Sequence, residues 1–111
     1  MKHEMNLNDE QFKKIKEGTK TVELRLYDVK RKALNVGDTI EFNNRATNEK
    51  IDVLVIGLKT YPNFEELYKN YEGISMGYEK DDIKNPEDMY KYYSKDEIKK
   101  YGTLAIEMKL L

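Results

Sequence analysis

Hydrophobic and polar residues alternate in several short runs, and a period of two predicts strands. The alternation is regular in residues 3–7, 21–27, 39–42 and 103–110. The run 51–58 contains more β-branched residues than any other part of the chain and predicts a further strand. Gly57 lies inside this run, where a glycine predicts a bulge or a sharp bend.

Between the first two of these strands, capping residues predict a short helix. Asn8 is a suitable N-cap, Phe12 and Ile15 form one apolar stripe, and Gly18 supplies the stop. Later in the chain, Asn63 caps a second helix.

The last helical region begins at Asn85-Pro86, where a capping side chain precedes a proline at the first helical position. Ser94 and Glu97 have the spacing of a capping box, so we expect the helix to kink or restart there and to end at Gly102. Strands with inserted helices predict an α+β domain, a small curved β-barrel of about five or six strands with helices at one side.

With 111 residues, the chain forms a single domain, 1–111. Its composition, 37% charged and 39% hydrophobic residues, is typical of a globular protein with a well-solvated surface. With no cysteine and one histidine, we expect neither disulfides nor a metal site, and no cofactor. No apolar run is long enough to cross a membrane and the N-terminal residues are polar, so we expect a cytoplasmic protein with no membrane partner.

Charge is distributed unevenly along the chain although the net charge is only -1. Residues 13–32 include eight Lys or Arg and three acids, whereas residues 72–97 include eight acids and four lysines. Clustered positive charge favours an anionic partner such as nucleic acid. The alternative is that both segments are solvated helix faces whose charges pair with each other.

The strand at 21–27 contains the most informative pattern. Val22, Leu24 and Leu26 fall on one face, whereas Glu23 and Arg25 fall on the other. An ordinary solvent-facing strand has the same pattern. We favour a ligand-facing strand, because it follows a helix that stops at a glycine and precedes a basic turn at 30–32.

The motif Gly18-x-Lys20-x-x-Glu23-x-Arg25 resembles the signature of the ASCH domain family. Three later segments are also similar to members of this family, so that the resemblance covers essentially the whole chain: Val36-Gly37-Asp38, Asp88-Met89-Tyr90 to Tyr93, and Tyr101-Gly102. The resemblance implies a PUA-like β-barrel, a fold that many RNA-binding modules use. It also implies that the signature strand lines a cleft between barrel and helices.

In such a cleft, Lys20 would hold an anion or an oxyanion, and the planar fork of Arg25 suits a phosphate or a base edge. Glu23 would accept a hydrogen bond from an amino group or act as a base. Lys20 and Glu23 are therefore the candidate catalytic residues. In the alternative interpretation, Glu23 and Arg25 form an ion pair that is purely structural.

Further candidate ligand-binding residues flank the signature strand. Tyr27, Tyr78 and Tyr93 are aromatic platforms on which bases would stack, or else parts of the core and its rim. The remaining candidates are the consecutive cations of the basic turn, which either contact backbone phosphates or form a solvated turn: Lys30, Arg31 and Lys32.

The resemblance implies more than one activity. Some related proteins are similar to amidohydrolases that remove the acetyl group of N4-acetylcytidine with a lysine, a threonine and a glutamate. Lys20 matches that lysine and Glu23 replaces the threonine. The distal glutamate has three candidates: Glu65, Glu66 and Glu72. Other members resemble nucleases or RNA binders.

Three functional classes follow. The first is a domain that binds RNA, a nucleotide or a nucleoside. The second is a metal-independent hydrolase acting on a modified nucleoside or on RNA. The third is an interaction domain without a nucleic-acid ligand. The oligomeric state is left open, a monomer included.

Overall fold

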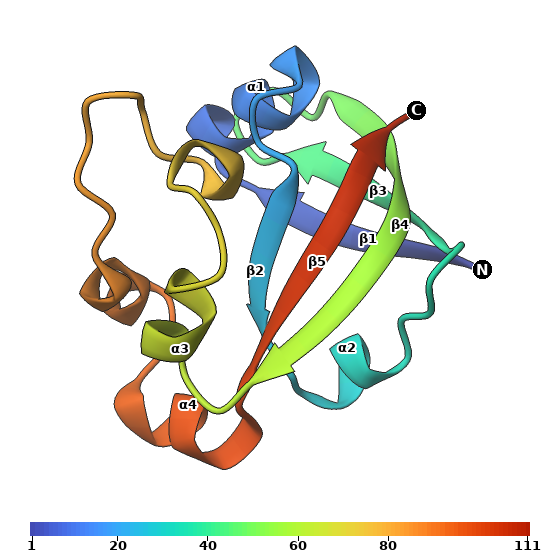
Figure 1. The fold of residues 1–111 in the computed structure, drawn as a ribbon. Helices are drawn as coiled ribbons and strands as arrows, with labels where there is room; N and C mark the ends of the chain where they lie inside the picture. The colour runs from blue at the N-terminus through green and yellow to red at the C-terminus, as the bar shows by residue number, and fades with distance from the viewer.

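A curled five-stranded sheet forms the centre of the fold, which the computed structural model describes over residues 1–111. The strand order is β1-β3-β4-β5-β2, and all pairs are antiparallel except β1 with β3. The strands are β1 (Lys2–Leu7), β2 (Val22–Leu26), β3 (Thr39–Asn44), β4 (Lys50–Tyr61) and β5 (Thr103–Leu110). The sheet is curled but does not close, since β1 and β2 remain its two edges, and it therefore forms a half-barrel (Figure 1). This confirms the predicted α+β class with a small curved barrel.

Six short helical segments connect the strands. They are α1 (Asp9–Glu17), α2 (Val29–Lys32), α3 (Phe64–Tyr68), α4 (Lys95–Tyr101) and the 3₁₀ turns η1 (Ile74–Met76) and η2 (Pro86–Lys91). The segments α3, α4 and the connection between them lie on the β2 side of the sheet, as Figure 1 shows. The sequence does not predict α2 and η1, because three or four residues are too few to show a helical apolar period.

The predicted helix boundaries are confirmed by their caps. Asn8 accepts a hydrogen bond from the backbone N–H of Gln11, and Gly18 ends α1 with a φ of 87°. The region after Asn85 divides as expected: η2 ends at Lys91, and α4 begins behind a complete capping box of Ser94 and Glu97. Each such cap contributes about 1 kcal/mol to helix stability.

Two hydrophobic clusters lie on opposite faces of the sheet. The larger cluster fills the inside of the curl under α1, and Phe12 and Phe42 are fully buried there. The smaller cluster packs β2 and β5 against α3, η2 and α4. It includes Val22, Leu24 and Leu26, so β2 is buried on both faces rather than on one. Truncating a buried Phe to Ala typically costs about 3–5 kcal/mol, so these clusters dominate the stability.

Strand β4 is longer than predicted and extends to Tyr61. Its register against β5 shifts between Val55 and Gly57, which confirms the predicted bulge. Gly57 lies so close to the Glu107 side chain that a Cβ atom there would overlap it. Beyond the bulge, β4 stays paired with β5 as far as Tyr61, and Asn63 follows two residues later as the N-cap of α3.

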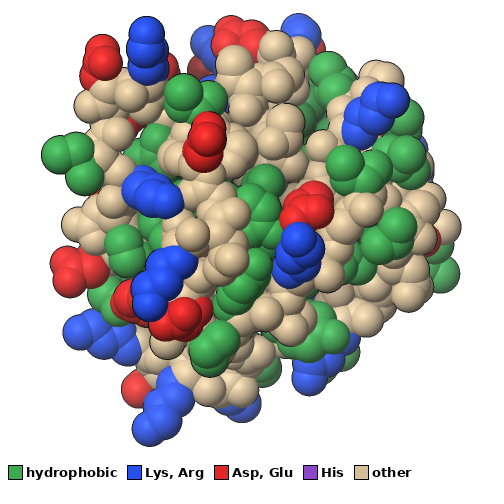
Figure 2. Space-filling model, viewed as in Figure 1, with side chains coloured by type: hydrophobic (Ala, Val, Ile, Leu, Met, Phe, Trp, Pro, Cys, Tyr) green, Lys and Arg blue, Asp and Glu red, His purple; other side chains and the backbone are tan.

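Acidic and basic side chains lie next to each other on the face shown in Figure 2, without a broad area of one sign. The longest helix, α1, has nine residues, and none of the helices could span a membrane.

Candidate ligand-binding pocket

Three charged side chains in and just before β2 converge in the structure. The Glu23 carboxylate lies between Lys20 and Arg25: Oε1 is 2.8 Å from Lys20 Nζ, and Oε2 accepts hydrogen bonds from Arg25 Nε at 2.9 Å and Nη2 at 2.7 Å. The Lys20 and Glu23 side chains are each 5% exposed, and that of Arg25 is 13% exposed. We call these three residues the charged triad.

The triad fixes the ionisation of its carboxylate. Burial alone would raise the pKa of Glu23, but the positive charges of Lys20 and Arg25 outweigh it and lower the pKa from 4.5 to about 2. Glu23 is therefore ionised at neutral pH. One carboxylate between two cations leaves the triad with a net charge of +1.

Neighbouring elements hold both cations in place. Gln11 Oε1 on α1 accepts a hydrogen bond of 2.6 Å from Lys20 Nζ. Arg25 Nη2 donates to the carbonyl oxygen of Asn6 on β1 at 2.9 Å, so Arg25 bridges the two edges of the half-barrel.

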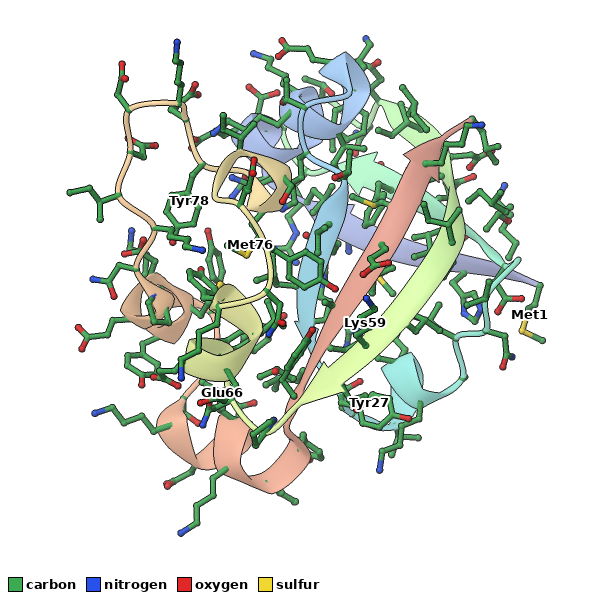
Figure 3. The ribbon with its side chains drawn as sticks, in the orientation of Figure 1. Met1, Tyr27, Lys59, Glu66, Met76 and Tyr78 are labelled. Carbon is green, nitrogen blue, oxygen red and sulfur yellow. The ribbon has the colours of Figure 1, made fainter.

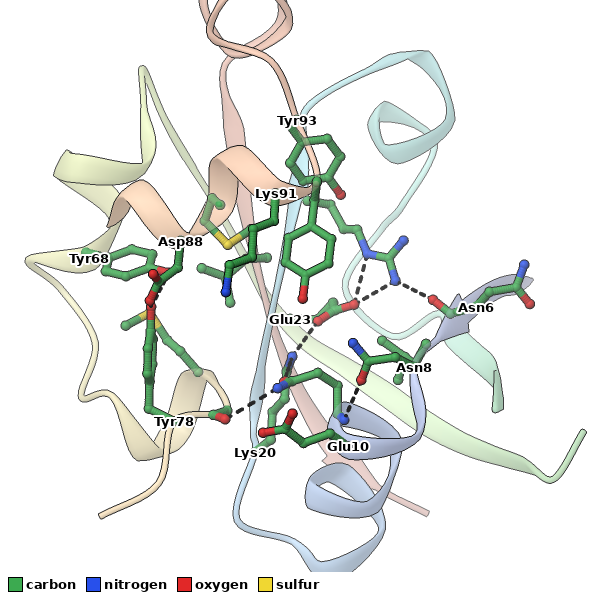
Figure 4. A pocket seen from close by; sticks show the side chains of 18 of the residues that line it. Asn6, Asn8, Glu10, Lys20, Glu23, Tyr68, Tyr78, Asp88, Lys91 and Tyr93 are labelled. Carbon is green, nitrogen blue, oxygen red and sulfur yellow. Dashed lines mark hydrogen bonds and ion pairs between the residues drawn. The ribbon is translucent and has the colours of Figure 1, made fainter. Parts of the chain in front are cut away.

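A cavity of about 660 Å³ opens beside the charged triad, and all three triad residues line it (Figure 4). Its volume is within the range of about 300–1,000 Å³ that is typical of small-molecule sites. Residues around the start of α1 form one wall. The opposite wall comes from α3, η1, η2 and the loop between the two 3₁₀ turns.

The opposite wall contains a chain of hydroxyl groups that ends on a carboxylate. The hydroxyl oxygens of Tyr68 and Tyr78 are 3.0 Å apart, and the Tyr78 hydroxyl donates to Asp88 Oδ2 at 2.7 Å. Burial raises the pKa of both tyrosines, so both hydroxyls stay protonated at neutral pH. Tyr78 was predicted as a ligand-contacting residue from the sequence, and the structure places it in the cavity wall.

Two further predicted residues, Arg31 and Tyr93, also line the cavity. The Tyr93 ring stacks on Phe64 with centroids 6.1 Å apart, and burial raises the pKa of its hydroxyl. Arg31 Nη1 pairs with Asp28 Oδ2 at 2.9 Å. Arg31 Nε is buried and has no hydrogen-bond acceptor.

The candidate ligand-binding residues Tyr27 and Lys30 lie outside this cavity, so the structure does not bring them together with the charged triad. Tyr27 follows the end of β2 at Leu26 and packs against the larger hydrophobic cluster, and Lys30 lies in α2. Lys30 Nζ donates to the Glu4 carbonyl oxygen at 3.0 Å, and the Lys32 ammonium lies 5.4 Å from the Tyr27 ring centre. Figure 3 shows Tyr27 near α2, away from Tyr78.

Several residues that the sequence did not single out also shape the site. Gln11, Arg45 and Lys91 line the cavity, and the buried Lys14 contacts two residues of its lining, Glu10 and Gly77. Lys14 Nζ donates to the Gly77 carbonyl oxygen at 2.6 Å and lies 3.1 Å from Glu10 Oε1 and 3.2 Å from Glu79 Oε1. These four residues come from segments far apart in the sequence, so only the folded structure shows that they lie at one site.

The three candidates for a distal catalytic glutamate do not line the cavity. Glu65 accepts a hydrogen bond from the Tyr90 hydroxyl at 3.2 Å, Glu66 pairs with Lys69 at 3.0 Å, and Glu72 is exposed to solvent. No Ser, Thr, Cys or His side chain lines the cavity either. No group of three or more His, Cys, Asp or Glu side chains is arranged to hold a metal ion.

The curled half-barrel with helices on one side defines a PUA-like domain. The model of the ASCH domain family matches residues 5–111, and the chain belongs to this family. Among solved structures, the chain is similar to the crystal structure of hypothetical protein PH0355, with a TM-score of 0.84, 32% identity and 100% of both chains covered.

It is also similar to the solution NMR structure of protein PF0455 from Pyrococcus furiosus, with a TM-score of 0.75 and 31% identity over 100% of this chain and 98% of the other. No curated protein matches the chain.

Proposed function

We propose that the pocket binds RNA or a nucleotide-like ligand. The observation that carries this proposal is the buried charged triad on the pocket floor. Glu23 holds Lys20 and Arg25 in fixed positions, so little side-chain entropy is lost when a ligand binds. The net positive charge of the triad favours a phosphate or an electron-rich base edge.

Two features of the surroundings support the same ligand class. Tyrosine side chains line the pocket opposite the triad, and bases commonly stack on such rings. In addition, the PUA-like fold is used by many RNA-binding modules, which supports the proposal by analogy.

Binding is favoured over hydrolysis by the state of the triad. An effective general base has a pKa near the working pH, whereas that of Glu23 is about 2. The Lys20 ammonium is already engaged by Glu23 and Gln11. Neither residue is thus poised for proton transfer, and the pocket lining contains no serine, threonine or cysteine nucleophile.

The test is a titration of fluorescently labelled single-stranded RNA at several salt concentrations. We compare the wild type with Lys20→Gln and Arg25→Gln. The matched control is Lys16→Gln, which removes an exposed lysine of α1 that pairs with Glu49 outside the pocket. We expect each pocket variant to weaken binding about tenfold or more, which corresponds to about 1.4 kcal/mol, and the control to bind as the wild type does.

Thermal unfolding of each variant shows whether the fold is retained. Equal affinities in all four proteins, or no binding by the wild type, would contradict the proposal. The same samples are incubated with N4-acetylcytidine and with RNA. Turnover that depends on Lys20 would establish the hydrolase instead.

A further inference from the structure

The pocket has two chemically different ends. At one end, Arg25 reaches β1 through Asn6, and Arg31 approaches from α2. At the other end, Tyr68, Tyr78 and Asp88 form the hydroxyl–carboxylate chain. Figure 4 shows this chain on the opposite side of Glu23 from Asn6. The basic segment 13–32 thus supplies the two arginines at one end of the cavity, and the acidic segment 72–97 supplies Asp88 at the other end.

The cationic end contains hydrogen-bond donors that the protein leaves unused. Arg25 bonds through Nε and Nη2, and Nη1 makes no hydrogen bond within the protein. Arg31 uses Nη1 for Asp28, whereas Nη2 makes no hydrogen bond within the protein, and Nε is buried without an acceptor, which is a costly arrangement. The Tyr93 hydroxyl, which lines the same cavity, has no partner either. Two guanidinium groups and a hydroxyl form a typical phosphate site.

The opposite end offers an acceptor beside an apolar wall. Asp88 Oδ2 is taken by the Tyr78 hydroxyl at 2.7 Å, whereas Oδ1 has no partner in the protein. Met76 and Met89 line the cavity beside these residues and provide a polarisable surface for a flat ring. A carboxylate oxygen in this position suits an amino group on the edge of such a ring.

We propose that the ligand is a nucleoside monophosphate unit whose base carries an exocyclic amino group. The phosphate binds between Arg25, Arg31 and Tyr93, and the amino group donates to Asp88 Oδ1. This inference rests on the proposed function and adds the ligand's orientation and the class of base. A free nucleotide and the terminal nucleotide of an RNA share this chemistry.

The Lys91 ammonium lies between the two ends in Figure 4 and has no ion pair within the protein. It is therefore positioned to add a cation along the path between base and phosphate.

The phosphate end is tested by calorimetric titration with cytidine and with cytidine 5′-monophosphate. For the wild type we expect the monophosphate to bind about tenfold more tightly, because charge-assisted hydrogen bonds to phosphate are strong. In Arg31→Gln this preference falls to about twofold or less. Lys32→Gln removes the neighbouring cation, which lies over Tyr27 outside the pocket, and keeps the full preference.

The base end is tested with the 5′-monophosphates of cytidine and uridine, which differ mainly in an amino or a carbonyl group at one ring position. We expect the wild type to prefer the cytidine form about tenfold. Asp88→Asn retains an acceptor for Tyr78 but presents an amide to the ligand, so the preference is lost or reversed. Glu87→Gln, the neighbouring acid outside the cavity, keeps it.

A parallel comparison of 5′-phosphorylated and unphosphorylated oligoribonucleotides distinguishes the sources of the phosphate. Tighter binding of the phosphorylated oligonucleotide than of the free nucleotide supports an RNA terminus, and the reverse supports a free nucleotide.

Equal binding of nucleoside and monophosphate, or equal losses for all ligands in Arg31→Gln, overturns the inference. RNA binding that still depends on Lys20 then leaves the proposed function standing. If the wild type binds no nucleoside, nucleotide or RNA, both fail.

Discussion

Gln11 on α1 accepts a hydrogen bond of 2.6 Å from the Lys20 ammonium, so the first helix sets the position of a cation on the pocket floor. Behind this contact, Gln11 Nε2 lies 3.4 Å from the carbonyl oxygen of Gly77. A Cβ atom at Gly77 would overlap the Gln11 side-chain oxygen. The backbone after η1 is thereby coupled to the charged triad through one glutamine.

Replacing Gly77 by alanine should disturb both the fold and the site. Gly77 has a φ of 107°, where any other residue is strained, and the new methyl group would displace Gln11. We expect a loss of about 1–3 kcal/mol in the free energy of unfolding, measured by denaturant titration. RNA binding should weaken at the same time.

Gly73→Ala is the matched control for this variant. Gly73 has a φ of -56°, and the nearest atom to an added Cβ is 3.5 Å away, an ordinary contact. Its free energy of unfolding should stay within about 0.5 kcal/mol of the wild type. A Gly77→Ala protein as stable as this control would contradict the coupling.

Glu23→Gln should destabilise the protein strongly. The amide leaves the buried ammonium of Lys20 and the guanidinium of Arg25 without a neutralising charge. Removing one partner of a buried ion pair typically costs about 3–5 kcal/mol. Equilibrium unfolding measures the loss, and Glu49→Gln, an exposed acid paired with Lys16, serves as the control with little expected change.

The pH dependence of stability should report the same carboxylate. The pKa of Glu23 is about 2 in the folded protein and close to its ordinary value of 4.5 when unfolded. Below pH 5 the unfolded state therefore takes up the proton first, and the stability contributed by ionised Glu23 is lost as the pH falls towards 2. A shift of this size corresponds to about 3 kcal/mol.

We expect the difference in the free energy of unfolding between the wild type and Glu23→Gln to become smaller as the pH is lowered from 7 to 2. The stability contributed by ionised Asp38 is also lost in this pH range, in the wild type and in the variant alike. Its pKa is lowered to about 2 by hydrogen bonds from His3, from the backbone of Asn35 and from the N-terminal ammonium. A gap that stays constant down to pH 2 would show that the Glu23 carboxylate is not stabilised by its two cations.

Lys14 should act as a tether between α1 and the backbone after η1. Lys14→Met removes the hydrogen bond to the Gly77 carbonyl oxygen and the ion pairs with Glu10 and Glu79, while keeping an apolar stem of similar length. We expect faster hydrogen exchange of the amides in residues 74–79. Lys13→Met, on the exposed side of the same helix, should leave this exchange unchanged. Equal exchange in the two variants would rule out the tether.

Local patterns predicted the parts of the structure that local interactions determine. Asn8 and Gly18 delimit α1 because capping involves only neighbouring backbone groups. Alternation along β2 placed Glu23 and Arg25 on one face, and the structure joins them by two hydrogen bonds. Two of the three triad residues on the pocket floor could thus be predicted from a single strand.

The remaining pocket residues could not be predicted in this way, because they come from segments far apart in the sequence. Gln11 contacts the triad, and Asp88 lines the opposite wall of the same cavity, only after the half-barrel has curled and η2 has packed against β2. Conversely, Tyr27 and Lys30 follow the strand closely and yet lie outside the cavity, since Tyr27 packs against the larger hydrophobic cluster and Lys30 lies in α2. A helix of four residues such as α2 gives no periodic signal in the sequence.

An NMR titration of isotopically labelled wild-type protein with single-stranded RNA tests the pocket most directly. We predict saturable shift changes concentrated in β2, at the start of α1 and in η2, with the Arg25 side-chain resonance among the most affected. Shift changes confined to α4 and the outer surface of β4, or no changes at all, would contradict the claim that the charged triad forms the floor of a nucleotide-binding pocket.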